Sequence, residues 1–426
     1  MVALKATIGR WGRSGLDWAR KRRRRAVTVG LTVAAGLYRR AFPKVRIVGV
    51  TGSCGKTTTT ELVSAVLERQ GPVQNGSVLL KENSNRWYPL VVLGLRPRHR
   101  FCAVELSGHG PGALTRATRH IPPDIAIVTH VGADHYKAFR SAEAISEEKG
   151  KLVECLPADG VAILNADDPL VWGMRTRTQA RVIGCGRSPA AEMRLVDLHA
   201  DWPERLTLRV AYDGQETTLR TRFVGEYAVV PILTALAAAA WQGMSLEEAA
   251  AVLEKVEPVD GRMSPHWLPG DITVIDDTWK APLYTIPAAM DFMRRASAKR
   301  KVIVFGSLSD YADNSSRRYR AVARDALNAA DHVAFVGRWA SSVSKLRNQV
   351  GDNRLATFES IRQLNEHLRA TLRSGDLVLL KGSFRNDHLE RLFLDRLEDG
   401  NLVACWRDNC RRGVRCQACD LLHGAA

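Results

Sequence analysis

The sequence predicts an α/β protein with a P-loop-containing, doubly wound central domain and a smaller, Rossmann-like C-terminal α/β domain. Residues 46–61, RIVGVTGSCGKTTTTE, have the pattern of a strand, a glycine-rich loop and the start of a helix. From residue 45 to about 185, short apolar runs alternate with helical stretches, which is typical of a parallel sheet covered by helices. The alternation resumes after residue 272, where we expect a second α/β unit.

The first of these patterns predicts a nucleotide-phosphate site. The apolar run Ile47 to Val50 indicates a buried strand, and the helix expected from about Thr58 would direct its N-terminus at a phosphate. Val50 stands where a strict P-loop has its first glycine, but the shorter form, TGSCGKT, is complete. The predicted phosphate-binding residues are Thr51, Gly52, Ser53, Cys54, Gly55, Lys56, Thr57 and Thr58.

The charge of the chain is concentrated at its start. The net charge is +17, and residues 1–46 carry 13 lysines and arginines against Asp17 alone. The arginine run at 22–25 has no interleaved aromatic residues, which argues against a nucleic-acid-binding platform. Four scattered cysteines, Cys54, Cys102, Cys155 and Cys185, are expected to be reduced thiols of a cytoplasmic protein.

The basic run at residues 20–25 precedes an apolar stretch, residues 26–38, that is too short for an ordinary transmembrane span. We expect an uncleaved helix that lies on an anionic membrane surface, at its inner face, or packs on the body of the protein. Insertion into the membrane is a third alternative.

Four segments are expected along the chain. They are a basic and apolar helical segment (residues 1–44), an ATP-binding central domain (45–258), a C-terminal domain (259–396) and a cysteine-rich tail (397–426). Residues 190–222 should form antiparallel strands, and an alanine-rich helix should cover Pro231 to Trp241. Further strands are predicted at Phe101–Glu105, Ile125–His130, Val161–Asn165, Ile272–Asp277, Val302–Gly306, His332–Gly337 and Leu377–Gly382.

Several short motifs follow one another in a fixed order. They are TGSCGKT (51–57), ELSxHxxG (105–112), THVGxDH (129–135), EKGKL (148–152), NADD (165–168), GR (261–262), IDD (275–277) and KGS (381–383). Together they resemble the Mur ligase superfamily over about residues 45–395. The stretch DDTWKAP (276–282) looks most like the branch that adds D-alanyl-D-alanine.

This resemblance implies an ATP- and Mg²⁺-dependent ligase that phosphorylates a carboxylate and lets an amine attack the acyl phosphate. Lys56 would then grip the β- and γ-phosphates, while Thr57 and Glu105 would hold one Mg²⁺. His135 would hold a second Mg²⁺. Lys149 lies where many relatives carry a carbamylated lysine, the alternative being an ordinary lysine in a helical salt bridge. The residues implied to be catalytic are Lys56, Lys149 and His135.

The resemblance also implies how the two substrates and the nucleotide are held. Arg262, Asp277 and Lys280 would contact the nucleotide, with Asp277 toward the ribose. Asn85, Lys381 and Ser383 would bind the substrates. The acid is expected to be a small molecule or a polymer, the amine an amino acid or a peptide, and a protein partner is a further expectation.

Two departures from the family pattern bear on the substrate. The segment that normally binds a UDP-sugar before the P-loop is replaced by about forty residues of basic sequence, and Trp87 stands where a glycine is usual. We therefore expect an acceptor other than a soluble UDP-muramyl peptide. Glu226-Tyr227-Ala228 replaces a His-Asn pair that contacts adenine in relatives.

The tail carries four cysteines with the spacing C-x₄-C-x₅-C-x₂-C: Cys405, Cys410, Cys416 and Cys419. This spacing predicts a tetrahedral Cys₄ zinc site. An iron–sulfur cluster and unligated thiols are the alternatives.

Two other functions remain open from the sequence. One is a membrane-associated poly-γ-glutamate-like synthetase, a branch that lacks the second α/β unit expected here. The other is a degenerate Mur-like protein that binds nucleotide and recruits partners. The retained Lys56, Glu105, His135 and Asp277 favour a catalytic ligase.

Overall fold

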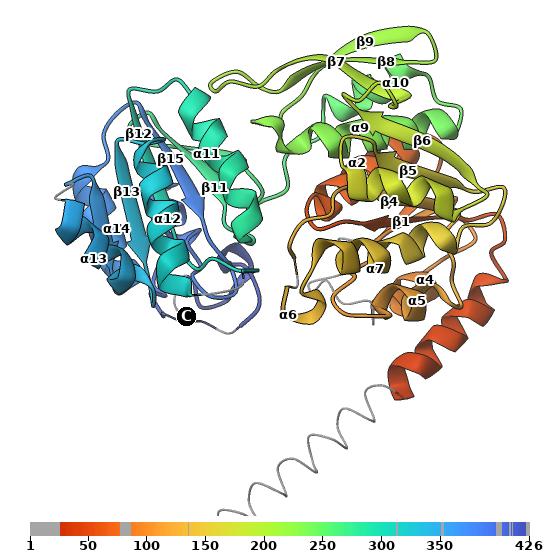
Figure 1. The fold of residues 1–426 in the computed structure, drawn as a ribbon, viewed down its shortest axis with the longest axis horizontal. Helices are drawn as coiled ribbons and strands as arrows, with labels where there is room; N and C mark the ends of the chain where they lie inside the picture. Colours follow the sequence, from red (N-terminus) through yellow and green to blue (C-terminus); the bar gives the residue numbers. More distant parts are fainter. Residues whose placement is uncertain are drawn as a thin grey trace, which may run out of the picture.

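The computed structural model describes residues 26–76, 87–134, 136–311, 314–350, 353–397, 403–408, 410 and 412–422. It contains two α/β lobes, each built on its own sheet (Figure 1). The fold class predicted from the sequence is confirmed.

The sheet of the first lobe has nine strands in the order β2-β3-β1-β4-β5-β6-β7-β8-β9. The pairs from β2 to β7 are parallel, and β7, β8 and β9 pair antiparallel. The strands are β1 (Arg46–Thr51), β2 (Val73–Asn75), β3 (Phe101–Glu105), β4 (Ile125–Val128), β5 (Val161–Asn165), β6 (Arg181–Gly186), β7 (Met193–His199), β8 (Thr207–Tyr212) and β9 (Gln215–Arg220). The order reverses direction at β1, so the loop after β1 lies where ligands bind in open α/β sheets.

Helices cover both faces of this sheet (Figure 1). One face is covered by α2 (Lys56–Glu68), α9 (Val229–Trp241) and α10 (Leu246–Leu253), whose apolar side chains form the largest core cluster. On the other face lie α4 (Tyr88–Leu93), α5 (Ala113–Thr118), α7 (Ala142–Glu154) and α8 (Pro169–Trp172). The short helix α6 (Tyr136–Phe139) precedes α7.

The second lobe has a six-stranded sheet in the order β10-β11-β15-β12-β13-β14. Only the pairing of β10 with β11 is antiparallel. Its strands are β10 (Ser264–Leu268), β11 (Ile272–Asp277), β12 (Arg300–Phe305), β13 (His332–Val336), β14 (Leu355–Phe358) and β15 (Asp376–Lys381). Its helices are α11 (Ile286–Arg295), α12 (Ser315–Leu327) and α13 (Ala340–Val350) on one face and α14 (Ile361–Thr371) and α15 (Arg391–Leu397) on the other.

A helix at residues 26–39 extends from the edge of the first lobe and is coloured red in Figure 1. It is held there by Ala35, which is fully buried, and by Tyr38, whose hydroxyl donates to the Leu95 carbonyl over 2.9 Å. Its other face leaves Val29 and Leu37 more than half exposed. Among the described residues, no helix is long and apolar enough to cross a membrane.

Most of the predicted elements lie where the sequence placed them. The antiparallel strands expected at 190–222 are β7 to β9, and the alanine-rich helix is α9. The helix expected from Thr58 begins two residues earlier, at Lys56, because Gly55 has a positive φ of 79° and turns the chain into the helix. Strands β2, β6, β10 and β14 were not predicted.

Candidate active site

The loop between β1 and α2 has the geometry of a phosphate cradle. Gly52 has a φ of 151°, and a Cβ at this position would lie 1.9 Å from the Thr129 hydroxyl, so no larger residue fits. The Thr129 hydroxyl donates to the Cys54 carbonyl over 2.6 Å and holds the loop against β4. The Lys56 ammonium donates to the Gly52 carbonyl of its own loop over 2.6 Å. The positive charge of Lys56 therefore already lies at the cradle. A bound phosphate would accept the Lys56 hydrogen bond in place of the Gly52 carbonyl.

A buried polar chain connects this loop to helix α7. The Ser53 hydroxyl donates to Asp134 Oδ1 over 2.7 Å and accepts from the Gly132 N–H over 2.8 Å. The other oxygen of Asp134 lies 3.5 Å from the Lys149 ammonium, which comes from α7. Asp134 thus couples the phosphate loop to the predicted catalytic lysine.

Lys149 is an unusual lysine because its side chain is only 1% exposed. Burial lowers its pKa to about 8, although the nearby Asp134 carboxylate acts in the opposite direction. About a tenth of the Lys149 amine is therefore neutral at pH 7, far more than for an ordinary lysine. Its neighbour Glu148 has a structural role, since its carboxylate accepts from the N–H groups of Gly112 and Leu114 at the start of α5.

At the entrance of the loop, the Thr57 hydroxyl lies between a carboxylate and a guanidinium. It donates to Glu105 Oε1 over 2.6 Å, and it accepts from Arg262 Nη2 over 2.7 Å. Glu105 is the last residue of β3 and is buried, whereas Arg262 comes from the segment just before β10 of the second lobe. Hydroxyl and carboxylate oxygens this close together are the hard donors that Mg²⁺ prefers, so the donor set fits this ion.

Two residues of the second lobe reinforce this contact between lobes. The Arg262 guanidinium lies over the Trp279 ring at 5.1 Å, and the Tyr284 hydroxyl donates to the Ser53 carbonyl over 2.8 Å. The Tyr284 ring also packs against Gly132, where a Cβ would come within 3.0 Å of it. Arg262 was predicted, but Tyr284 was missed, because a single tyrosine in a loop carries no motif.

At the ends of two neighbouring strands, Asp277 of β11 and Lys381 of β15 form an ion pair. The two residues are direct partners in the parallel register, which places both at the carboxyl edge of the second sheet. Lys280 lies nearby in sequence, and its ammonium is 2.8 Å from Asp310. These three predicted nucleotide and substrate residues therefore already have partners within the second lobe.

The Ser383 loop is organised by a buried carboxylate. Asp387 accepts from the Ser383 N–H over 2.9 Å and from both the N–H and the hydroxyl of Ser307, each over 2.6 Å. Burial raises the pKa of Asp387 even though these donors act against the shift. Its role is to hold two loops together at the carboxyl ends of β12 and β15.

The residues of the NADD motif support β4 and the loop that follows it. The Asn165 amide donates to the Thr129 carbonyl over 2.8 Å, and Asp168 Oδ2 lies 2.7 Å from His130 Nδ1. Burial would raise the pKa of Asp168, but hydrogen bonds from His130 and the Val131 N–H lower it overall. This carboxylate also caps α8, so its part is to fix the THVG segment behind the phosphate loop.

The structure thus brings together the predicted residues 51–58, Glu105, Lys149 and Arg262 around one loop. Asp277 and Lys381 pair at the carboxyl edge of the second sheet and Ser383 follows Lys381, whereas Lys280 pairs with Asp310. Two predicted site residues, Asn85 and His135, lie outside the described residues, as does the basic run at 20–25.

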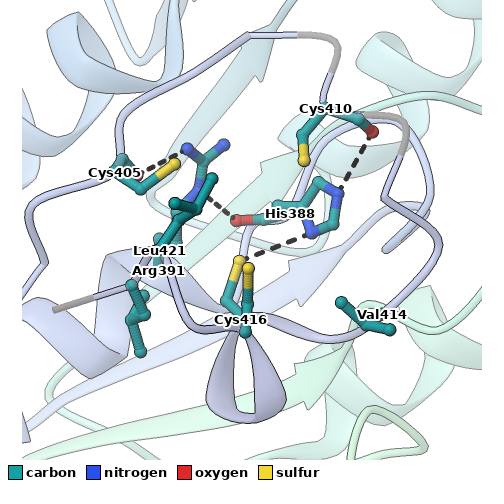
Figure 2. Close-up of a pocket in the computed structure, with 9 residues that line it drawn as sticks. His388, Arg391, Cys405, Cys410, Val414, Cys416 and Leu421 are labelled. Atoms are coloured by element: carbon teal, nitrogen blue, oxygen red, sulfur yellow. Dashed lines mark hydrogen bonds between the residues drawn. The ribbon is translucent and has the colours of Figure 1, made fainter. Parts of the chain in front are cut away.

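The four tail cysteines gather at one cavity with two residues from outside the tail. Figure 2 shows this cavity, which is lined by His388 and Arg391 together with Cys405, Cys410, Val414, Cys416, Cys419, Leu421 and Leu422. His388 was missed from the sequence because it precedes the cysteine cluster and carries no spacing signal of its own.

Comparisons with known proteins now identify the class. Residues 50–239 match the Mur ligase middle domain, and residues 261–384 match the Mur ligase glutamate ligase domain. The chain therefore belongs to the Mur ligase family and is an ATP-dependent, peptide-bond-forming ligase. The two alternative functions gain no support from these matches.

Within the family, the chain resembles enzymes that share one name. The UDP-N-acetylmuramoyl-tripeptide–D-alanyl-D-alanine ligase of Mycobacterium leprae is 30% identical over 370 residues, which cover 79% of this chain and 71% of that protein. The enzyme of the same name from Mycobacterium tuberculosis is 29% identical over 364 residues, with 79% and 70% covered.

Solved structures support the fold. The chain superimposes on MurF from Acinetobacter baumannii with a TM-score of 0.77 and 23% identity, over 87% of this chain and 81% of that one. MurF ligase from Thermotoga maritima, solved in complex with ADP, gives a TM-score of 0.71 at 20% identity, over 84% and 80%.

Proposed function

We propose that this chain uses ATP to convert a peptide carboxylate into an acyl phosphate and joins it to the amine of an amino acid or short peptide. ATP phosphorylates the acid and leaves as ADP, and attack by the amine expels inorganic phosphate and forms the amide. The observation that carries the proposal is the Thr57 hydroxyl held between Glu105 and Arg262 at the entrance of the phosphate loop.

In this proposal, the side chains around the loop neutralise the negative charge that develops during phosphoryl transfer. Lys56 would exchange its hydrogen bond to the Gly52 carbonyl for one to a phosphate oxygen. Thr57 and Glu105 would hold Mg²⁺, which supplies positive charge next to the transferred phosphoryl group. Arg262, from the other lobe, would bring a further positive charge to the same place.

The edge of the second sheet would complete the site. We assign Asp277 to the ribose of the nucleotide, and Lys381 and Ser383 to the amine substrate. Support comes from the ion pair of Asp277 and Lys381, since it fixes both side chains at the carboxyl ends of adjacent strands, where ligands bind in such sheets. Lys280 would stand beside them, oriented by Asp310.

Helix 26–39 is proposed to rest on an anionic membrane at the inner face of the cell. Its outward surface exposes Val29, Val33 and Leu37, which are spaced four residues apart along one stripe of the helix. The helix ends near the exposed basic residues Arg40 and Lys44. Such a surface would place the ligase beside acids that are carried on lipid or polymer.

The amine is proposed to be D-alanyl-D-alanine or a related dipeptide, because the relatives named above act on it. The decisive experiment measures phosphate release and product mass with ATP and Mg²⁺ when acid and amine are supplied singly and together. The acids are a UDP-muramyl tripeptide and the same tripeptide carboxylate without the nucleotide, and L-alanyl-L-alanine serves as the control amine. Phosphate release that requires acid and amine together supports a ligase, and the preferred acid defines the carrier. ATP binding without phosphate release for any pair contradicts the proposal.

A further inference from the structure

The cysteine-lined cavity of the tail lies outside the proposed ATP site and is unused by the proposed reaction. It is small, about 10 Å³, which leaves room for one ion or one water-sized sphere. Its lining comes from three parts of the chain: His388 and Arg391, then Cys405 and Cys410, then residues between 414 and 422.

Two groups in this cavity already have the spacing of ligands to one metal ion. His388 Nδ1 and Cys416 Sγ are 3.4 Å apart, and both residues are buried. Tetrahedral Zn²⁺ with bonds of about 2.3 Å to sulfur and about 2.0 Å to nitrogen would place two such atoms roughly 3.5 Å apart. The pair therefore needs little movement to bind a metal.

The imidazole ring is also oriented as a metal ligand. Its Nε2 lies 3.3 Å from the Cys410 carbonyl, and since a carbonyl can only accept, Nε2 carries a proton. Backbone carbonyls commonly orient zinc-binding histidines in this way. The remaining nitrogen, Nδ1, then faces both Cys416 Sγ and the Glu390 carboxylate, and all three ligand atoms lie within 4.8 Å of one another.

The Glu390 carboxylate supports the same conclusion. It is fully buried; one oxygen accepts from the Cys416 N–H over 3.1 Å, and the other has no hydrogen-bond partner among the described residues. The oxygen that accepts from Cys416 also lies 3.4 Å from His388 Nδ1. Because the other oxygen is unpaired, this buried carboxylate calls for a positive charge beside it. A metal ion or a protonated imidazole would supply it.

Figure 2 distinguishes the remaining thiols. The Cys410 side chain points toward the imidazole, whereas Cys405 lies beside the Arg391 guanidinium, which donates to the Cys405 carbonyl over 2.8 Å. Cys419 follows Cys416 in a C-x-x-C turn closed by a hydrogen bond of 3.0 Å from the Cys419 N–H to the Cys416 carbonyl. We propose that one Zn²⁺ binds here through His388, Cys410, Cys416 and Cys419, with Cys405 outside the coordination sphere.

This site would position a residue that reaches the nucleotide-binding segments. Arg415, next to the ligand Cys416, donates to Asp276 over 2.7 Å. Its guanidinium also fills the space where a side chain at Gly261 would lie, 1.9 Å from the Cβ position. Asp276 and Gly261 directly precede Asp277 and Arg262, so the bound ion would hold both proposed nucleotide residues in place through Arg415. The positioning role of Arg415 rests on the proposed function, whereas the metal site does not.

The first test is metal analysis of the full chain purified without a metal-affinity step. We expect roughly one zinc per chain, and a loss of at least about tenfold in metal affinity for His388→Ala and Cys416→Ser. Cys405→Ser and the remote control Cys155→Ser should retain the metal. Replacement of zinc by Co²⁺ should give the visible absorption of a tetrahedral, thiolate-bound ion. Absence of bound metal, with His388 protonated instead, overturns the site, and loss of zinc in Cys405→Ser with retention in His388→Ala overturns the ligand set.

The second test uses Arg415→Met, which leaves every proposed ligand intact. It should retain its zinc, raise the KM for ATP and leave kcat less affected, and Arg415→Lys should recover part of the loss. Unchanged KM in a variant that keeps its metal overturns the positioning role. A chain that binds zinc but lacks ligase activity would contradict the proposed function while leaving the metal site supported.

Discussion

Arg262 of the second lobe donates a hydrogen bond of 2.7 Å to Thr57 of the phosphate loop, and the Thr57 hydroxyl donates in turn to Glu105. One hydroxyl thus joins the carboxylate of one lobe to the guanidinium of the other. Since Mg²⁺ and a guanidinium both carry positive charge, they would compete for the Thr57 oxygen. Arg262 is therefore expected to leave Thr57 when the metal and nucleotide bind, and to turn toward the phosphates.

Replacing Arg262 should weaken catalysis more than it weakens the fold. We expect Arg262→Ala to lower kcat/KM for ATP by about 10- to 100-fold, because one or two charge-assisted hydrogen bonds would be lost. Arg262→Lys should recover only part, because lysine cannot reproduce the planar contact with Trp279. Arg338→Ala, which removes an exposed arginine over Trp339, is the matched control and should have wild-type kinetics. Equal kinetics for Arg262→Ala and the control would contradict the assignment.

Lys56 should be indispensable for phosphoryl transfer. Lys56→Ala removes the charge that rests on the Gly52 carbonyl, and we expect turnover to fall by about 10²- to 10³-fold. The melting temperature should change little, because the Lys56 side chain is only partly buried. Lys44→Ala, an exposed lysine before β1, is the control. Wild-type rates of phosphate release from Lys56→Ala would show that ATP binds elsewhere.

Carbamylation of Lys149 should rise with pH. The reaction consumes the neutral amine and releases a proton, and burial lowers the pKa of Lys149 to about 8, so the modified fraction should increase between about pH 7 and pH 9. A carbamate would place an anion beside Asp134, which requires a cation between the two groups.

The measurement is ¹³C NMR of protein equilibrated with labelled bicarbonate, with and without Mg²⁺. Lys149→Ala should lose most activity, lack the carbamate signal and regain activity with added short carboxylic acids. If Lys149→Ala turns over normally, the lysine serves only in its ion pair with Asp134.

Helix 26–39 should bind vesicles that contain anionic lipid, and salt should weaken this binding. Placing charges on its exposed face with Val29→Asp and Val33→Asp should release the protein, because each valine would otherwise contact the acyl boundary. Trp267→Asp changes an equally exposed apolar residue of the second lobe and should leave vesicle sedimentation unaltered. If the Val29→Asp, Val33→Asp and Trp267→Asp proteins sediment equally with vesicles, the helix surface does not bind membrane. Preferential binding to RNA would instead assign the basic segment to nucleic-acid binding.

How far the sequence predicts this structure depends on the kind of signal each part carries. The buried parallel strands are continuous apolar runs, so β1, β3, β5 and β11 were predicted to within one residue. Strand β10, SPHWL, was missed because it is an edge strand with proline, histidine and an exposed tryptophan.

In the candidate site, too, residues with a local sequence signal were predicted and residues without one were missed. Residues within one motif, such as Lys56 and Thr57, could be assigned because the loop conformation is local. The contact between Thr57 and Arg262 joins residues 205 positions apart, and it depends on how the two lobes meet. The same applies to Tyr284 on Ser53 and to His388 beside the tail cysteines, since no local pattern records which distant side chains share a cavity.

The ion pair between Asp276 and Arg415 has a consequence for how the protein is made. Asp276 lies in β11 with a side chain that is 0% exposed, yet its cationic partner is 139 residues further along the chain. At synthesis rates of about 5–20 residues per second, on the order of ten seconds pass before that partner emerges from the ribosome. Until then Asp276, near the end of β11, lacks its cationic partner, so this lobe should remain open to proteases and chaperones while the first lobe has already folded.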